Sequence, residues 1–132
     1  MIEFRNVSKV YNNGTEALHN INLKVEKGEF VFIVGSSGAG KSTFLKLITC
    51  EERPNEGQVL IDGQDISHIR KGKIPYVRRK MGLVFQDFRL IDHMTVYDNV
   101  AFAMRVVGAS PKAIKKRVPY ILGLVGLSLI HI

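Results

Sequence analysis

The chain has 132 residues, of which 45% are hydrophobic and 23% charged, and its formal net charge is +7 at pH 7. These values are typical of one globular domain, and no apolar run in the sequence is long enough to cross a bilayer. No signal-peptide pattern opens the sequence. The single cysteine, Cys50, excludes an intrachain disulfide or a cysteine metal cluster, and the four histidines lack ligand spacing.

Two short segments near the N-terminus alternate apolar and polar residues. Residues 2–7 and 21–25 show this period of two, which predicts half-buried β-strands, and Asn13-Gly14 between them predicts a turn. An apolar, β-rich run at residues 30–34 predicts a third strand. Two outer strands ahead of it predict an antiparallel layer packed beside a parallel α/β core.

The next stretch, Gly-Ser-Ser-Gly-Ala-Gly-Lys-Ser-Thr, fits the phosphate-binding pattern G-x-x-x-x-G-K-[ST]. The helical spacing of apolar residues at 43–48 predicts a helix directly after it, so an ordinary Gly/Ser-rich turn is the weaker interpretation. Glycines let successive N–H groups point into one concavity, Lys41 supplies charge for the β- and γ-phosphates, and Ser42 offers a hydroxyl to Mg²⁺. The candidate nucleotide-binding residues are Gly35, Ser36, Ser37, Gly38, Ala39, Gly40, Lys41, Ser42 and Thr43.

Beyond the loop, residues 58–63 predict a strand that ends in an Asp-Gly turn, and residues 65–70 a short helix. Residues 81–85 form another apolar β run, with Gln86 at its end. Ligand contacts in α/β folds come from the ends of core strands, so Gln86 is a candidate ligand-binding residue. A simple strand-capping amide is an equally good interpretation of Gln86 from its spacing alone.

Two helices are predicted in the last third of the chain. Apolar residues recur at helical intervals over residues 98–107. Ser110 is a candidate N-cap and Pro111 a first helical residue for an amphipathic helix over residues 112–122. Pro119 inside that helix predicts a kink or an early end.

The positive charge is concentrated in two clusters, neither of which alternates with aromatic residues as a base-stacking surface would. Solvated basic faces are the first interpretation, contact with anionic headgroups the second, and nucleic-acid binding is not expected. The clusters are Arg70, Lys71, Lys73, Arg78, Arg79 and Lys80, and then Lys112, Lys115, Lys116 and Arg117.

Several motifs fall in an order that resembles the ATPase subunits of ABC transporters. They are residues 7–11, 35–43, 57–63, 84–86 and 95–100. Three further stretches, residues 51–54, 74–82 and 85–90, resemble the cell-division branch of that family. The resemblance extends over nearly the whole chain, to about Leu127.

The resemblance implies an α/β fold: a P-loop NTPase core of the ABC ATPase type with an N-terminal antiparallel β layer and the start of a helical subdomain, truncated. Residues 1–86 would form the incomplete nucleotide-binding core and residues 87–127 the start of the helical subdomain. Residues 128–132 would be an atypical, spurious end of a truncated reading frame.

The resemblance also implies ATP and Mg²⁺ as cofactors and gives roles to individual residues. Tyr11 would stack on adenine, and the residues from Gly35 to Thr43 would wrap the phosphates. Ser42 and Gln86 would meet Mg²⁺, and Gln86 would sense the γ-phosphate.

The implied partner is an FtsX-like integral membrane protein, contacted by the segment after Gln86, and the full-length form would be a homodimer with ATP at its interface. The protein would then lie peripherally on the cytoplasmic face of the bacterial plasma membrane. Asp92 departs from a proline expected nearby in the family. Alternatives are an ATPase of an importer or lipoprotein-release ABC system, which residues 87–90 disfavour, and a non-catalytic nucleotide-binding module.

Three family features do not occur in the sequence: a Leu-Ser-Gly-Gly-type signature, an apolar strand ending in Asp-Glu, and a switch histidine. Phosphoryl transfer depends on positioning and charge stabilisation, so the chain alone is expected to lack hydrolysis and to hold no catalytic residue. The strand before the P-loop would also have an unpaired apolar edge, so the isolated chain is expected to be marginally stable and to aggregate.

Overall fold

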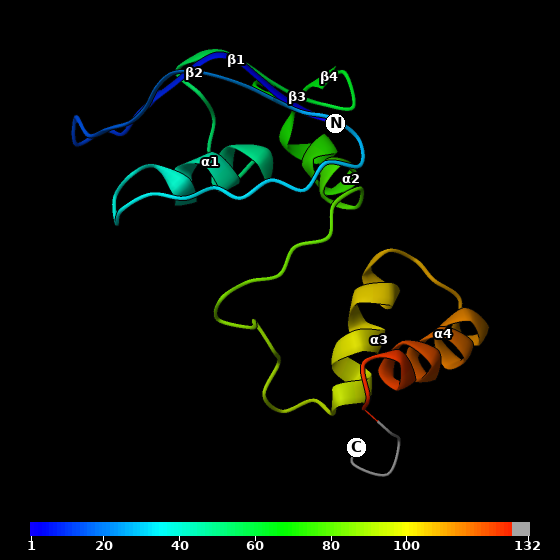
Figure 1. The fold of residues 1–132 in the computed structure, drawn as a ribbon. Helices are drawn as coiled ribbons and strands as arrows, with labels where there is room; N and C mark the ends of the chain where they lie inside the picture. Colours follow the sequence, from blue (N-terminus) through cyan, green and yellow to red (C-terminus); the bar gives the residue numbers. More distant parts are fainter. Residues whose placement is uncertain (128–132) are drawn as a thin grey trace. The chain divides into compact units, whose positions relative to one another are not determined.

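The computed structural model describes residues 1–127, so the expectation for residues 128–132 lies outside the described residues. The chain divides into two compact units, Met1–Met81 and a second that begins at Gly82 (Figure 1). The elements of the first are β1 (Ile2–Val10), β2 (Glu16–Val25), α1 (Lys41–Ile48), β3 (Glu56–Ile61), β4 (Gln64–Asp65), the 3₁₀ turn η1 (Lys71–Lys73) and α2 (Ile74–Arg78). The second contains α3 (Val96–Val106) and α4 (Pro111–Leu124).

An antiparallel sheet forms the first unit, with strand order β2-β1-β3-β4. Phe4 in the central strand β1 is paired with Leu23 of β2 and with Val59 of β3. The register of β1 shifts between Phe4 and Val7, which places both side chains in the core although they are three positions apart. The predicted antiparallel layer is therefore present, and it is built from both sides of the P-loop in the sequence.

Helix α1 lies against this sheet and supplies three of the ten buried residues of its core (Figure 1). Phe44, Leu47 and Ile48 are buried, and the Phe44 ring stacks on Phe4 with centroids 4.3 Å apart. This spacing of three and four residues gives the helix one apolar side, and burial of that side fixes the helix on the sheet.

Two predicted core strands are absent from the described residues. Residues 30–34 and 81–85 form no strand, and their side chains include some of the most exposed apolar groups, with Phe30 at 84%, Val34 at 85% and Val84 at 101% of full exposure. A strand exists only with a hydrogen-bonding neighbour, and no neighbour for either run lies within residues 1–127. The strand predictions for residues 30–34 and 81–85 are therefore wrong for this chain, although an unpaired apolar edge is expected for residues 30–34.

The short helix predicted at residues 65–70 is also wrong. Gln64–Asp65 pairs with β3 as strand β4, and the Asp65 carboxylate accepts a hydrogen bond from the backbone N–H of Ser67 at 2.9 Å. This local turn competes with a helix, since Asp offers the backbone an alternative partner. The helix forms later instead, as α2, with Pro75 in its first turn.

The second unit has both predicted helices. Ile114, Val118 and Leu122 of α4 are buried with Ala101 of α3 in one apolar cluster. Pro119 does not end α4, which continues to Leu124, because the buried residues on either side of the proline keep packing against α3. Within residues 1–127, none of the helices combines the length and apolar character that crossing a membrane requires.

Candidate nucleotide-binding site

The P-loop turns sharply into α1 at Gly40. This residue has φ of +83°, in the left-handed region, and a Cβ atom there would lie 2.3 Å from the carbonyl oxygen of Ala17. Gly38 has φ of +80° but open space around it. Glycine at position 40 is therefore required twice, for its backbone conformation and for the close approach of β2.

The beginning of α1 carries unneutralised positive charge. Gly40 gives the helix no side-chain cap, and no acidic residue occurs in its first turn. Its free N–H groups and helix dipole therefore favour an anion. Lys41 adds an ammonium group, which donates to the carbonyl oxygens of Gly35 at 2.7 Å and Ser36 at 2.5 Å. The Lys41 ammonium group is therefore hydrogen-bonded to carbonyl oxygens of its own loop.

Tyr11 follows β1 and reaches the same helix. A turn closed by the Gly14 N–H on the Tyr11 carbonyl oxygen (2.8 Å) brings the chain back into β2, as Asn13-Gly14 predicts. The Tyr11 hydroxyl lies 3.0 Å from the Thr43 hydroxyl, and either can donate. An aromatic ring distant in sequence is thereby held beside the phosphate-binding motif.

An open pocket of about 340 Å³ joins these parts. Most of its lining residues come from the motif and from Tyr11, but Thr15 and Ala17 of the β2 region carry no sequence signal that could have identified them. The lining residues are Tyr11, Thr15, Ala17, Ser37, Gly38, Gly40, Lys41, Ser42 and Thr43. Gly35, Ser36 and Ala39 lie in the same loop but do not line the pocket. One aromatic ring, one ammonium group and several hydroxyls in one pocket can contact a nucleobase and phosphates.

The predicted Mg²⁺ ligands are divided between the two units. The exposed Ser42 hydroxyl lines the pocket, and such neutral oxygens are suitable ligands for Mg²⁺ alongside phosphate oxygens. Gln86 is an exposed residue of the second unit, so a joint role with Ser42 stays a prediction. Among residues 1–127, no three His, Cys, Asp or Glu side chains are grouped as a metal site.

Cys50 lies at the other end of α1, away from the residues that line the pocket. It is partly buried and has a left-handed backbone, with φ of +57°. Burial raises the pKa of the Cys50 thiol, although the positive charges of Arg78 and Arg53 oppose the shift. The thiol is therefore a poor nucleophile at neutral pH and has no part in the site.

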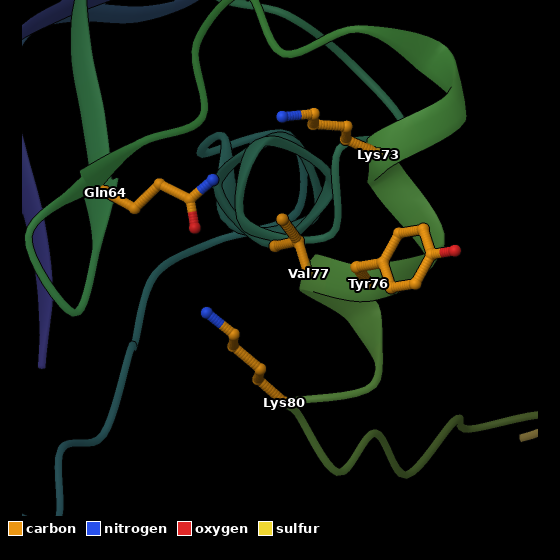
Figure 2. Close-up of a pocket in the computed structure, with 5 residues that line it drawn as sticks. All are labelled: Gln64, Lys73, Tyr76, Val77 and Lys80. Carbon is orange, nitrogen blue, oxygen red and sulfur yellow. The ribbon is translucent and has the colours of Figure 1, made fainter.

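A second hollow of about 280 Å³ lies elsewhere in the first unit and shares no lining residue with the P-loop pocket. Figure 2 shows Lys73 and Lys80 on either side of Val77, with the Gln64 side chain turned toward the same space and Tyr76 turned away. Residues 70–80 contain six cations and no carboxylate. The first basic cluster is therefore an exposed basic face, as predicted, without a phosphate-binding motif.

The phosphate-binding motif at the start of a helix that packs on a sheet places the chain in the class of P-loop nucleotide-binding proteins. The sequence profile of the ABC transporter family matches residues 18–131, and the chain therefore belongs to this family.

Two cell-division ATP-binding proteins named FtsE are similar to this chain over 127 residues, or 96% of its length. The protein of Bacillus subtilis strain 168 is 54% identical, with 56% of its own length covered, and that of Escherichia coli K12 is 45% identical, with 57% covered. The methionine import ATP-binding protein MetN of Helicobacter pylori HPAG1 is 41% identical over 96% of the chain, with 39% of its own length covered.

The solved structure of the ATP-binding cassette MJ0796, a dimer bound to ADP and Pi, superposes with a TM-score of 0.87 at 36% identity. The superposition covers 99% of this chain and 60% of the MJ0796 chain. The fold is therefore that of part of an ABC ATPase cassette. The chain spans little more than half the length of the FtsE relatives it matches.

Proposed function

We propose that the chain binds ATP with Mg²⁺ in the P-loop pocket, as part of an FtsE-like subunit of a cell-division ABC complex. The observation that carries this proposal is the pocket in which Tyr11 and the uncapped beginning of α1 meet. The names of the FtsE relatives support the assignment to cell division.

Binding would use groups that the loop now pairs with itself. Lys41 would exchange the carbonyl oxygens of Gly35 and Ser36 for β- and γ-phosphate oxygens, which are stronger acceptors because they are charged. The N–H groups at the start of α1 would receive the remaining phosphate oxygens. Tyr11 would stack on adenine, and Ser42 with Gln86 would hold Mg²⁺ in its oxygen ligand set.

Hydrolysis is not part of this proposal for the chain alone. The signature sequence, the Asp-Glu strand and the switch histidine do not occur in it, and those groups supply the positioning on which phosphoryl transfer depends. In the complete complex, two such subunits would enclose ATP and work with an FtsX-like membrane protein at the cytoplasmic face of the plasma membrane.

The test is calorimetric titration of the 132-residue chain with ATP and Mg²⁺. Lys41→Met should weaken ATP binding by about 10- to 100-fold, since it removes a charged hydrogen-bond donor. Lys46→Met, which removes an exposed charge in the last turn of the same helix, is the matched control and should leave the affinity unchanged. Equal affinities of Lys41→Met and the wild type would overturn the proposal.

A second candidate within the family is the ATPase of an importer, since MetN is 41% identical. Co-purification separates the two: an FtsE-like protein should retain an FtsX-like partner, and an importer ATPase should retain its permease. A module that binds ATP but never hydrolyses it with either partner would be the third outcome, a non-catalytic nucleotide-binding protein.

A further inference from the structure

Lys9, the penultimate residue of β1, lies between a carboxylate and an aromatic ring. Its ammonium group is 2.9 Å from the Glu52 carboxylate and 5.2 Å from the centre of the Tyr11 ring. Only 12% of the Lys9 side chain is exposed, compared with 50% for Lys24 in the neighbouring strand. A lysine so far withdrawn from water is held by its partners, because burial of an unpaired ammonium group is costly.

The connector after α1 is fastened to the same end of β1 by two further hydrogen bonds. Asn55 accepts from the backbone N–H of Val10 through its side-chain oxygen, at 2.8 Å, and donates its own N–H to the carbonyl oxygen of Ser8, at 2.9 Å. Together with the ion pair from Glu52, these bonds tie residues 52–55 to the last three residues of β1. The connector therefore holds the end of β1 that leads directly into Tyr11.

Tyr11 is then restrained at both ends of its side chain. Lys9 lies over the ring, and the hydroxyl meets Thr43 at 3.0 Å. Lys9 is not among the residues that line the pocket, while Tyr11 is. An aromatic ring fixed in this way presents its surface to a ligand without losing rotamer freedom when the ligand binds.

We infer that Lys9 and Glu52 form a positioning pair that holds the Tyr11 ring ready to stack on a planar nucleobase. The role of this pair rests on the proposed ATP-binding function. Base recognition would then depend on the connector after α1, because that connector contains Glu52. The pair acts chiefly on the base, because Lys9 itself contacts Glu52 and the Tyr11 ring, and the link onward to the phosphate-binding loop is the single Tyr11–Thr43 hydrogen bond. A ligand with phosphates and no base therefore depends on it little.

Two ligands, ATP and inorganic tripolyphosphate, separate positioning from simple loss of charge. Lys9→Met, which keeps an unbranched apolar side chain and removes the ammonium group, should weaken ATP binding by about fivefold. It should leave binding of tripolyphosphate, measured by the same titration of the 132-residue chain, unchanged. Lys9→Arg should restore ATP binding, since a guanidinium can both pair with Glu52 and lie over the ring.

Glu52→Gln provides a second variant that keeps Lys9 in the chain. It should weaken ATP binding in the same direction, and the double variant with Lys9→Met should lose no more than Lys9→Met alone. Lys24→Met, at an exposed lysine paired with Glu26, is the control for the loss of one positive charge.

Three results would overturn the positioning pair: unchanged ATP binding in Lys9→Met, equal losses for ATP and tripolyphosphate, or additive losses in the double variant. A wild-type chain that binds tripolyphosphate as tightly as ATP would also overturn it, because no base contact would then exist. Failure of the ATP-binding function itself is recognised separately, by a Lys41→Met variant that binds both ligands like the wild type.

Discussion

The beginnings of α1 and α3 differ in what satisfies their free N–H groups. In α3, the Thr95 hydroxyl accepts from the backbone N–H of Asp98 at 3.0 Å, and the Asp98 carboxylate places negative charge in the first turn. Helix α1 starts from Gly40, with neither a side-chain cap nor an acid. A structural helix closes its own N-terminus, whereas a binding helix leaves it open for a ligand.

The loop before α3 satisfies its polar groups with internal hydrogen bonds, whereas the start of α1 leaves its N–H groups without a side-chain cap. The side-chain amide of Asn99 donates to the carbonyl oxygens of Ile91, Met94 and Thr95, and its oxygen accepts from the N–H of Ile91. Asn99, which lies in the stretch 95–100 that resembles the family, therefore has a structural role in this loop. Polar residues in the two loops look alike in sequence, but the Asn99 amide is hydrogen-bonded to the backbone of its own loop, whereas the P-loop groups share a pocket with Tyr11.

The largest expected effect is at the turn that opens α1. Gly40→Ala should lower the free energy of unfolding by about 3 kcal/mol, because the new methyl group is strained by the left-handed backbone and collides with Ala17. Gly38→Ala, with the same backbone strain and free space, should cost about 1 kcal/mol. Denaturant unfolding measures both, and equal losses would show that the contact with β2 does not matter.

Giving α1 the acidic first turn of α3 should remove its binding character. Ser42→Glu should stabilise the helix by about 0.5 kcal/mol through its dipole. It should also weaken ATP binding by about tenfold or more, because a carboxylate would face the phosphates. Calorimetry and unfolding, measured on one preparation, should therefore move in opposite directions. Movement of both in the same direction would mean that the variant has lost its fold.

Removing the cap of α3 should affect stability alone. Thr95→Ala should cost about 1 kcal/mol in the free energy of unfolding, and Thr95→Ser, which keeps the hydroxyl, should cost little. Neither variant should change the affinity for ATP. A reduced affinity in Thr95→Ala would contradict the division into structural and binding helix ends.

The smallest effect concerns the closed far end of α1. Because burial raises the pKa of the Cys50 thiol, less thiolate is present at any pH below that pKa than in the unfolded chain. Alkylation of the folded chain at pH 8 should therefore be several-fold slower than alkylation of the chain unfolded in urea. The pH at which the alkylation rate rises should also be higher for the folded chain than for the unfolded chain. Equal rates in the folded and unfolded chain would mean that the end of α1 is open.

Local signals in the sequence predicted much of the fold. The P-loop, the Ser110 cap and the turn at Asn13-Gly14 each depend on a few adjacent residues, and their chemistry is the same in any context. The runs at residues 30–34 and 81–85 depend on strands that must pair with them, so their apolar pattern alone does not make a strand.

The missed parts of the site are contacts between distant segments. Thr15 and Ala17 enter the pocket only because β2 lies beside Gly40. The ion pair of Lys9 with Glu52 has no local signal either, since it forms where the connector crosses the end of β1. Sequence patterns indicate the groups that touch phosphate more readily than the groups that hold them in place.

The contact between Tyr11 and Thr43 joins residues 32 positions apart, so the complete pocket exists only after β1, β2 and α1 have assembled. A nucleotide that binds both sides of this contact would select the folded state and add to its stability by mass action. At a free ATP concentration about one hundred times Kd, the gain is about 2.7 kcal/mol, a large share of the stability of a small domain. The folded fraction of such a chain would then rise with the concentration of the nucleotide that it binds.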